Sequence, residues 1–466
     1  MKVDPFRLNK KTREQCVLYK MLRSCGRHLS FHTPGHKIGE WDITELSFSD
    51  NLTAPTGCIQ TAQTEMAKIL GAAASFISTD GSTGGIFAIL YAAKSLGVQK
   101  IAFPETAHKS LYNGCSVLGL EAVTFAVERK NGIPMPYSLT VLSAAVDNAD
   151  ALFITSPDYY GNIPDLKGIA ALCWEKGKYL FIDGAHGGHL HFDKNLYAGA
   201  YADLWVDGVH KSLPAYTQGA VVSARTPALA AKLSEGLDVF RTTSPSYPIM
   251  ASVEYAVKFP RNEKLESCVK EFVFEYPEFF YFGGDWTKLC FLAGRQSFDI
   301  AKELETQGVF AEFCDGNVIM FYLSPALKLS QFKRLKKALL GYIEALKLMW
   351  SPSEKMVPIT AEKTQEKLQE NPQKVQEKLQ EEVQEEPVRQ IPAPVVLEKG
   401  TETEWVELAV ATGRVCAKVC GLFPPCMPLI LEGEVILEKK ILLLEKADNT
   451  FGLKDGKICV YKSING

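Results

Sequence analysis

Short apolar runs alternate with helical patterns along residues 60–260 of this 466-residue chain. Seven of the runs have the length and composition of buried strands, and helical segments lie between most of them. The runs are Ala73–Ser78, Ile101–Phe103, Ala122–Ala126, Ala151–Thr155, Tyr179–Ile182, Leu204–Val206 and Ala220–Ser223. Because strands that alternate with helices favour a parallel sheet, we predict an α/β domain with a mainly parallel sheet covered by helices.

The pattern differs on either side of this region. Residues 1–44 are expected to form an N-terminal helical arm, with Val17, Leu18, Met21 and Leu22 on one side of a helix. The large domain then covers residues 45–260, and a smaller α+β domain is predicted for residues 261–350. Its expected elements are helical Leu265–Phe274 and Ser297–Gln307, strand-like Lys288–Ala293 and Val318–Tyr322, and a long helix that ends near Leu348.

Residues 351–395 interrupt the apolar pattern. The string QEKLQE occurs at Gln365–Glu370 and again at Gln376–Glu381, in a segment rich in Gln, Glu and Lys. Such a segment can bury little surface, so we predict a solvated linker, with a coiled-coil partner site as the alternative. Residues 396–466 are apolar again and predict a small C-terminal domain, with strands around Leu429–Glu432, Val435–Leu437 and Ile441–Leu444.

Charge and cysteine content restrict the class of protein. The formal net charge of -3 does not suggest nucleic acid or an anionic membrane surface as a partner. No apolar run reaches the roughly 18 residues that span a bilayer, and no signal peptide is recognisable. The 12 cysteines are scattered. Reduced, buried thiols in a cytoplasmic protein explain them better than a metal site at Cys416, Cys420 and Cys426.

The string TDGSTGG at Thr79–Gly85 follows a strand-like run and precedes a helical pattern. Glycines allow a close backbone approach to an anion, Ser82 and Thr83 add hydroxyl donors, and the start of the following helix favours a phosphate. A tight turn capped by Ser or Thr would look the same in the sequence. Alone, the string does not decide between these two interpretations.

Two carboxylates and a lysine follow later strand-like runs. Asp183 in FIDGAHG and Asp207 in WVDGVHK each end such a run, where open α/β sheets bind ligands, although Asp183 could instead be a turn cap. Lys211 follows Asp207 in a loop. Its amine could act as a nucleophile if desolvation or nearby positive charge lowered its pKa, whereas an isolated Lys211 would be read as a surface lysine.

The order of these features is more informative than any one of them. A phosphate-binding turn, a strand-end aspartate and a loop lysine are what pyridoxal phosphate (PLP) requires: an anchor for its phosphate, a carboxylate against the pyridine nitrogen and an amine for the Schiff base. His108, in the string AHKS, could stack its ring on the pyridine or be a structural histidine.

With these motifs assembled, the chain resembles the ornithine/lysine/arginine decarboxylase family of fold type I PLP enzymes. The similarity covers about residues 28–350 and returns at 409–437. It is clearest in FHTPGHKIG (31–39), DITEL (42–46), GSTGG (81–85), AHKS (107–110), SPDYYGNIPDL (156–166), DGAHGGHL (183–190), HKSLPAYTQGA (210–220) and TSPSYP (243–248). The strings PPCMP (424–428) and EGE (432–434) are similar to the family's C-terminal domain.

The resemblance implies a role for each matching residue. It makes Lys211 the Schiff-base lysine, Asp183 the partner of the pyridine nitrogen and His108 the stacking residue, and these three form the expected catalytic set. Further cofactor-binding residues are expected at Gly81, Ser82, Thr83, His186, His210 and Ser244. Ser244 belongs to a segment, Thr243–Tyr247, that resembles one reaching the site of a neighbouring subunit, which implies a homodimer or a larger homo-oligomer.

The chain departs from the family pattern at several positions. Many relatives have an acidic residue where Gly184 stands and a serine, which touches the phosphate, where Gly208 stands. A glycine is usual at Cys426 and a histidine is frequent near Thr53, and the extra N-terminal domain of the larger decarboxylases is not found in this chain.

These observations predict a cytoplasmic enzyme that decarboxylates arginine, lysine or ornithine to an amine, a reaction used in polyamine biosynthesis. Another fold type I reaction, such as transamination or a lyase reaction, is the alternative, with Arg295 as a candidate to hold the retained carboxylate. A non-catalytic relative is a third reading, motivated by Gly184 and Gly208.

Overall fold

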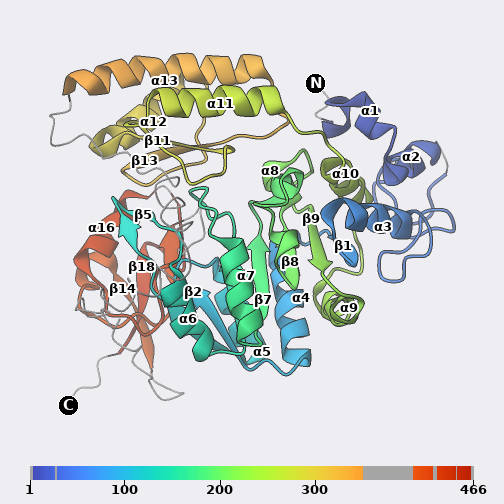
Figure 1. Cartoon of the computed structure of the whole chain (residues 1–466), viewed down its shortest axis with the longest axis horizontal. Helices are drawn as coiled ribbons and strands as arrows, with labels where there is room; N and C mark the ends of the chain where they lie inside the picture. Colours follow the sequence, from blue (N-terminus) through green and yellow to red (C-terminus); the bar gives the residue numbers. More distant parts are fainter. Residues whose placement is uncertain (1–3, 27–28, 350–401, 423–427, 448, 463–466) are drawn as a thin grey trace.

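The computed structural model describes residues 4–26, 29–349, 402–422, 428–447 and 449–462 (Figure 1). Its central sheet consists of β1 (Ala74–Ser78), β2 (Lys100–Pro104), β3 (Glu121–Phe125), β6 (Ala151–Thr155), β7 (Tyr179–Gly184), β8 (Leu204–Asp207) and β9 (Ala220–Ala224). The spatial order is β1-β9-β8-β7-β6-β2-β3, and β9 runs antiparallel to both of its neighbours while the other pairs are parallel. All seven predicted runs are therefore strands of one mainly parallel sheet, which confirms the predicted α/β class.

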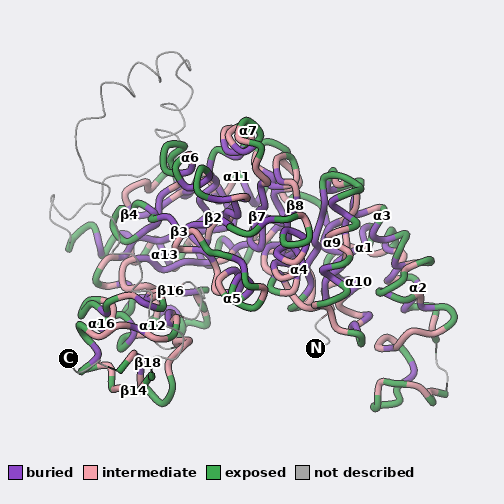
Figure 2. Tube along the Cα trace, turned by 90° about the horizontal axis from the view of Figure 1, so that it is seen from below, coloured by how far each residue is buried: buried purple, intermediate pink, exposed green. Residues whose placement is uncertain are grey.

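Helices cover both faces of this sheet (Figure 1). One face packs against α4 (Gly81–Ser95), α5 (Lys109–Leu118) and α9 (Pro227–Phe240), and the other against α3 (Cys58–Leu70), α6 (Leu139–Asp147), α7 (Leu166–Glu175) and α10 (Tyr247–Val257). Side chains of a strand alternate between the faces. In β6, accordingly, Leu152 and Ile154 belong to one core and Ala151 and Phe153 to the other. Figure 2 shows these central strands as the buried interior.

Several short elements connect the sheet or lead into it. They are the N-terminal η1 (Pro5–Arg7), α1 (Lys10–Arg13) and α2 (Val17–Ser24), the hairpin of β4 (Arg129–Lys130) and β5 (Ile133–Pro134), and the loop elements η2 (Gly188–Phe192), η3 (Ala198–Ala200) and α8 (Val209–Ser212). Helix α2 buries Leu18, Met21 and Leu22, as the sequence pattern predicts for the arm.

The second domain has an antiparallel sheet in the order β10-β11-β13-β12. Its elements are α11 (Glu263–Glu275), β10 (Phe280–Tyr281), β11 (Lys288–Leu292), η4 (Gly294–Gln296), α12 (Ser297–Thr306), β12 (Phe313–Cys314), β13 (Val318–Tyr322) and α13 (Leu329–Met349). Helices α11 and α13 lie side by side on one face of this sheet (Figure 1). The other face packs on Tyr159 and Tyr160, which follow strand β6 of the large domain. This contact places the small domain over the carboxyl edge of the large sheet.

The C-terminal part is a compact cluster of small elements. They are β14 (Thr403–Glu407), which pairs with β18 (Lys457–Tyr461), a sheet of β15 (Cys420–Leu422), β16 (Pro428–Ile430) and β17 (Thr450–Phe451), the short η5 (Leu408–Val410), and α16 (Glu438–Lys446). The apolar core beneath them includes Ile430, Ile441 and Ile458. Lys109 at the start of α5 places its Nζ 4.8 Å from the centre of the Phe451 ring, which joins this part to the large domain.

Two of the three strands predicted in this C-terminal part are wrong. Ile441–Leu444 lies inside α16, and Val435 makes only an isolated bridge with Val415. A run of four apolar residues does not distinguish a strand from a buried helix. The flanking residues decide, because leucine, lysine and glutamate favour helices and Glu438 and Lys446 lie at the ends that the helix dipole prefers.

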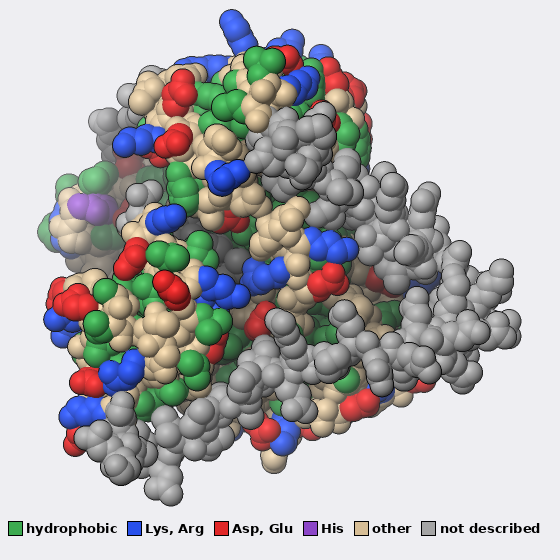
Figure 3. Space-filling view, turned by 90° about the vertical axis from the view of Figure 1, so that its left-hand side faces the viewer, with side chains coloured by type: hydrophobic (Ala, Val, Ile, Leu, Met, Phe, Trp, Pro, Cys, Tyr) green, Lys and Arg blue, Asp and Glu red, His purple; other side chains and the backbone are tan. Residues whose placement is uncertain are grey.

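The predicted linker, residues 351–395, lies outside the described residues, as does Cys426 with most of the PPCMP string. Within the part of the chain that the structure describes, no helix combines the length and the apolar character needed to cross a bilayer. On the face shown in Figure 3, lysine and arginine side chains are interspersed with aspartates and glutamates rather than gathered into a patch of one sign.

Candidate active site

A cavity of about 760 Å³ opens at the carboxyl edge of the large sheet, beneath the small domain. It forms where loops leave β1, β2, β6, β7 and β8, which is the usual ligand site of an open α/β sheet. Eight of the nine predicted site residues line it: Gly81, Ser82, Thr83, His108, Asp183, His186, His210 and Lys211. Widely spaced motifs of the sequence therefore converge on one site.

One end of the cavity has the features of an anion cradle. Gly81 begins α4 with a φ of 68°, and the side chain of the N-cap residue Asp80 makes no capping hydrogen bond. The Oγ atom of Ser82 is buried and has no hydrogen-bond partner among the described residues. The Gly81 amide donates to the carbonyl of Gln218, so the following amides of Ser82 and Thr83, beside the unpartnered Ser82 hydroxyl in the first turn of a 15-residue helix, suit a phosphate.

Gly208 closes this cradle from the side of β8. A Cβ atom at position 208 would lie 2.5 Å from the carbonyl oxygen of Ala185 and 2.8 Å from Ser82 Oγ. The serine that many relatives have here therefore does not fit unless the neighbouring atoms move. At Gly184 a Cβ would lie 2.9 Å from Oδ1 of Asp207, so the carboxylate of Asp207 occupies the space that an acidic side chain at 184 would need.

Asp183 lies on β7 at the floor of the cavity and is 5% exposed. Its Oδ1 accepts a hydrogen bond from the backbone of Ala185 at 3.0 Å. Burial raises the pKa of Asp183, while the positive charge of Lys211 and the Ala185 N–H oppose that rise. A protonated ring nitrogen beside this carboxylate would supply the charge partner that a buried anion needs.

Lys211 lies in α8, just after β8, and its Nζ is 3.1 Å from Nε2 of His186. The rings of Tyr159 and Tyr322 enclose His186, with centroids 5.0 Å and 5.7 Å from its own. Burial, followed by the positive charge of Lys211, lowers the pKa of His186 well below its usual value. A neutral His186 can accept a hydrogen bond from the lysine nitrogen.

The other two histidines are also held in neutral surroundings. His108 caps α5 and accepts a hydrogen bond at Nδ1 from the Ser110 backbone at 3.2 Å. Burial, with a smaller contribution from the charge of Lys211, lowers the pKa of His108 to about 3. His210 donates from Nδ1 to the Gly219 carbonyl at 2.9 Å, and burial lowers its pKa. An uncharged His108 ring at the cavity wall suits stacking on an aromatic cofactor.

Two residues named from the sequence do not line the cavity. Ser244 is exposed, and its backbone N–H bonds to Thr242 Oγ1 at 3.1 Å. Arg295, the candidate for holding a retained carboxylate, is exposed in η4. The described residues that line the cavity include no arginine.

The structure adds residues that the sequence did not single out. Asp158 and Tyr159 come from the loop after β6, and Glu312 and Tyr322 come from the small domain. The hydroxyl of Tyr159 donates to Glu312 Oε1 at 2.7 Å. The SPDYYGN string marked the first pair only as part of a motif, and no local pattern marks Glu312 or Tyr322, because their position depends on how the two domains pack.

The donor set of the cavity fits PLP. The unpartnered Ser82 hydroxyl and the uncapped start of α4 suit its phosphate, Asp183 suits its ring nitrogen, and Lys211 lines the same cavity. A mainly parallel sheet with this site at its carboxyl edge defines a fold type I PLP-dependent enzyme.

Comparison with known proteins identifies the family. Residues 35–279 match the model of the Orn/Lys/Arg decarboxylase major domain, and the chain belongs to this family of PLP-dependent decarboxylases. It is 26% identical to an arginine decarboxylase of Bacillus subtilis in an alignment 470 positions long that covers 90% of each protein. It is also 26% identical to the protein YaaO of the same organism, over 92% of this chain and 93% of YaaO.

Solved structures agree on the fold. The lysine decarboxylase LdcF of Francisella novicida superposes with a TM-score of 0.70 at 19% identity, over 96% of this chain and 81% of that one. The constitutive lysine decarboxylase of E. coli gives a TM-score of 0.67 at 18% identity, over 98% and 82% of the two chains. The predicted fold class and family are thus confirmed.

Proposed function

We propose that this enzyme converts arginine, lysine or ornithine to the corresponding amine and carbon dioxide, with Lys211 as the lysine that carries PLP. One observation supports this assignment most directly. The side chains expected to handle the cofactor all line one cavity: Lys211, His186, Asp183, His108 and Ser82. When bound, PLP supplies an electron sink for the bonding electrons that remain on the substrate's α-carbon as carbon dioxide leaves.

The chain's own residues have separate tasks in this proposal. Ser82, Thr83 and their backbone amides hold the phosphate, and Asp183 keeps the ring nitrogen protonated. The neutral ring of His108 packs on the face of the cofactor. Lys211 and His186, whose nitrogens are 3.1 Å apart, hold the proton that is returned to the α-carbon.

The charges of the cavity favour a basic substrate. Its described lining includes the carboxylates of Asp80, Asp158, Asp183 and Glu312 but no arginine. Asp183 is assigned to the cofactor, and Asp158 already accepts hydrogen bonds from the backbone of Tyr160 and from Asn162. Asp80 directly precedes the helix start assigned to the phosphate and accepts a hydrogen bond from the backbone N–H of Thr242. Glu312, at the wall formed by the small domain, accepts one hydrogen bond from Tyr159 but has no task with the cofactor, and we assign it to the cationic end of the substrate.

The same lining argues against transamination. An aminotransferase retains the substrate carboxylate and usually binds it with an arginine, whereas a decarboxylase must release it. The rings of Tyr159 and Tyr322 line the cavity, and the water that they displace there can no longer solvate that carboxylate, which favours its loss.

We also propose that the enzyme acts in the cytoplasm and in polyamine biosynthesis. It forms a homodimer or a larger homo-oligomer, in which the exposed Ser244 of one subunit contributes to the site of its neighbour. The domain limits are 1–44, 45–260, 261–350, 351–395 and 396–466. Separate apolar cores support the division into large, small and C-terminal domains, whereas the limit at residue 44 rests on the sequence pattern, because Phe6 and Leu18 pack into the core of the large domain.

A substrate panel tests the reaction and the substrate class together. The PLP-loaded enzyme is incubated with arginine, lysine, ornithine and their neutral analogues citrulline and norleucine, and amines, keto acids and carbon dioxide are quantified. We expect an amine and equimolar carbon dioxide from at least one basic amino acid, and at least tenfold lower kcat/KM for its neutral analogue. Keto-acid formation without carbon dioxide would contradict the proposal.

A further inference from the structure

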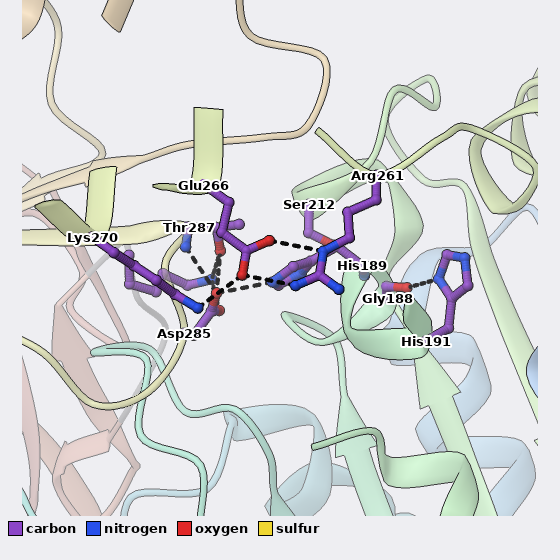
Figure 4. Close-up of polar contacts among 10 residues, drawn as sticks. Gly188, His189, His191, Ser212, Arg261, Glu266, Lys270, Asp285 and Thr287 are labelled. Atoms are coloured by element: carbon purple, nitrogen blue, oxygen red, sulfur yellow. Dashed lines mark hydrogen bonds and ion pairs between the residues drawn. The ribbon is translucent and has the colours of Figure 1, made fainter. Parts of the chain in front are cut away.

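A buried group of charged side chains lies next to the cavity that Lys211 lines, but does not line the cavity itself. Asp285 is 1% exposed, and its carboxylate accepts from His189 Nε2 at 2.9 Å and from Lys288 Nζ at 3.2 Å. Thr287 adds two hydrogen bonds to the same carboxylate through its backbone at 2.9 Å and its hydroxyl at 2.8 Å. Figure 4 shows His189 and Thr287 converging on Asp285. Burying charged groups away from water costs desolvation free energy, so a buried charged cluster is expected to have a structural or functional role.

The cluster joins the two domains. Lys288 is the first residue of β11 in the small domain, and Asp285 and Thr287 directly precede that strand. His189 belongs to η2 of the large domain, three residues after His186. Burial opposes the ionisation of Asp285, but its interactions with His189, Lys288 and Thr287 outweigh burial and hold the pKa of Asp285 well below its usual value. The carboxylate is therefore an anion that fixes one residue from each domain.

One branch from Asp285 reaches Lys211 through its backbone. The N–H of His189 donates to Ser212 Oγ at 3.3 Å, and Ser212 directly follows Lys211 in α8. Figure 4 shows Ser212 beside His189. Asp285 holds the ring of His189, and His189 holds the turn that carries the lysine.

The other branch reaches the Lys211 side chain. The Nζ atom of Lys288 lies 3.7 Å from the centroid of the Tyr322 ring, a close cation–π contact. The Tyr322 ring packs edge-on against His186, and His186 Nε2 lies 3.1 Å from Lys211 Nζ. The stem of Lys288 is also confined, because a Cβ at Gly161 would lie only 2.9 Å from its Cβ.

The geometry points to Lys288 as a positioning residue for Lys211. Lys288 is held by Asp285 and packs Tyr322 against His186. The Asp285 carboxylate also fixes the turn that bears Lys211, through His189 and Ser212. This assignment rests on the proposed role of Lys211. It makes correct placement of the small domain a condition for correct placement of the lysine. The charge of Lys288 adds to this, since after burial and Lys211 it further lowers the pKa of His186.

The charged and titratable groups around Lys211 determine how a substitution of Lys288 should change the protonation of the Lys211 nitrogen. The groups that sense its charge are His108 from α5, Asp183 and His186 from β7 and its loop, His210 from α8, and Lys288 from β11. Replacing Lys288 by methionine removes one positive charge from this set. With less positive charge nearby, the protonated form of the Lys211 nitrogen is more stable than in the wild type, so its proton is lost at a higher pH.

The test compares Lys288→Met with Lys258→Met in the full-length, PLP-loaded protein. Lys258 is a matched control, because its side chain is 8% exposed, pairs with the buried Glu254, and is not among the residues that line the cavity. Steady-state kinetics, thermal unfolding and a pH titration of the visible absorbance of bound PLP are measured for each variant.

For Lys288→Met we expect kcat to fall about 10- to 100-fold with KM changed less than about threefold, because misplacement of a reacting group costs rate. The midpoint of the absorbance titration should rise by about one pH unit. Lys258→Met should lower thermal stability but leave kcat and the midpoint unchanged. Lys288→Met with the wild-type kcat and midpoint would overturn the inference.

A second variant covers the case in which Lys288→Met does not fold. His189→Leu removes the other branch and leaves the Asp285–Lys288 pair in place, and kcat should again fall at least tenfold. An unchanged kcat would overturn the inference. If the wild-type enzyme decarboxylated no amino acid, the proposed function would fail, whereas the absorbance midpoint of bound PLP would still test the role of Lys288.

Discussion

At the scale of residues, close packing around the phosphate end of the cavity explains why Gly208 differs from the family pattern. The position has no room for a Cβ beside Ser82 Oγ and the Ala185 carbonyl. The sequence alone suggests that a phosphate contact has been lost here. The structure shows instead that Ser82 approaches the Gly208 backbone and occupies the space of the missing side chain.

We therefore expect Gly208→Ser to weaken the enzyme rather than restore a contact. Overpacking of this kind costs about 1–3 kcal/mol, so PLP should dissociate about tenfold more readily and the thermal midpoint should fall. Gly341→Ser is the control, because the described surroundings of Gly341 on α13 leave open space. Equilibrium dialysis of PLP measures the effect, and tighter PLP binding in Gly208→Ser would show that this account of the position is wrong.

The site residues could be predicted from the sequence to a clear limit. Residues within ordered motifs, such as Ser82, Asp183 and Lys211, lie where parallel strands end, and the sheet brings those ends together. Glu312, Tyr322 and Lys288 were not found, because they reach the site only through the packing of the small domain. The role of Ser244 stays a prediction, since it concerns a neighbouring subunit.

At the scale of elements, the N-terminal arm depends on one buried carboxylate. Glu254 in α10 accepts hydrogen bonds from the backbone N–H groups of Val17 and Leu18, each at 2.8 Å, and pairs with Lys258 at 2.6 Å. Cys16, the N-cap of α2, makes no side-chain capping bond. Glu254 therefore replaces the missing cap from another helix, a role that no local sequence pattern reveals.

Glu254→Gln should destabilise the arm selectively. The amide can accept only one of the two backbone bonds well, and Lys258 keeps only its more exposed partner Glu65, so the change should cost about 1–3 kcal/mol. Hydrogen exchange should accelerate in residues 17–24 at least tenfold. The strands of the central sheet serve as the internal reference, and equal acceleration in both regions would contradict a local role.

The strands of the central sheet were predictable because their apolar runs are bounded by polar residues and separated by helical periodicity. The run Ile441–Leu444 was not, because its four apolar residues fit a strand and a helix equally well. Its helical state in α16 depends on Ile441 and Leu444 packing, one turn apart, into the C-terminal core. Tertiary packing decided where local pattern was ambiguous.

At the scale of the whole molecule, the active site lies between two domains of different construction. The large domain supplies the residues assigned to PLP, and the small domain supplies Glu312 and Tyr322 at the cavity and Asp285 and Lys288 behind it. Glu312, the carboxylate that we propose to bind the substrate, therefore lies on the domain whose position is hardest to infer from sequence.

The most direct test of the central claim is release of carbon dioxide from carboxyl-labelled arginine, lysine and ornithine by the wild-type enzyme and by Lys211→Ala. We predict labelled carbon dioxide from at least one of the three with the wild type, and a rate at least about a thousandfold lower with Lys211→Ala because the covalent anchor of PLP is gone. Carbon dioxide released by Lys211→Ala at the wild-type rate would contradict the account.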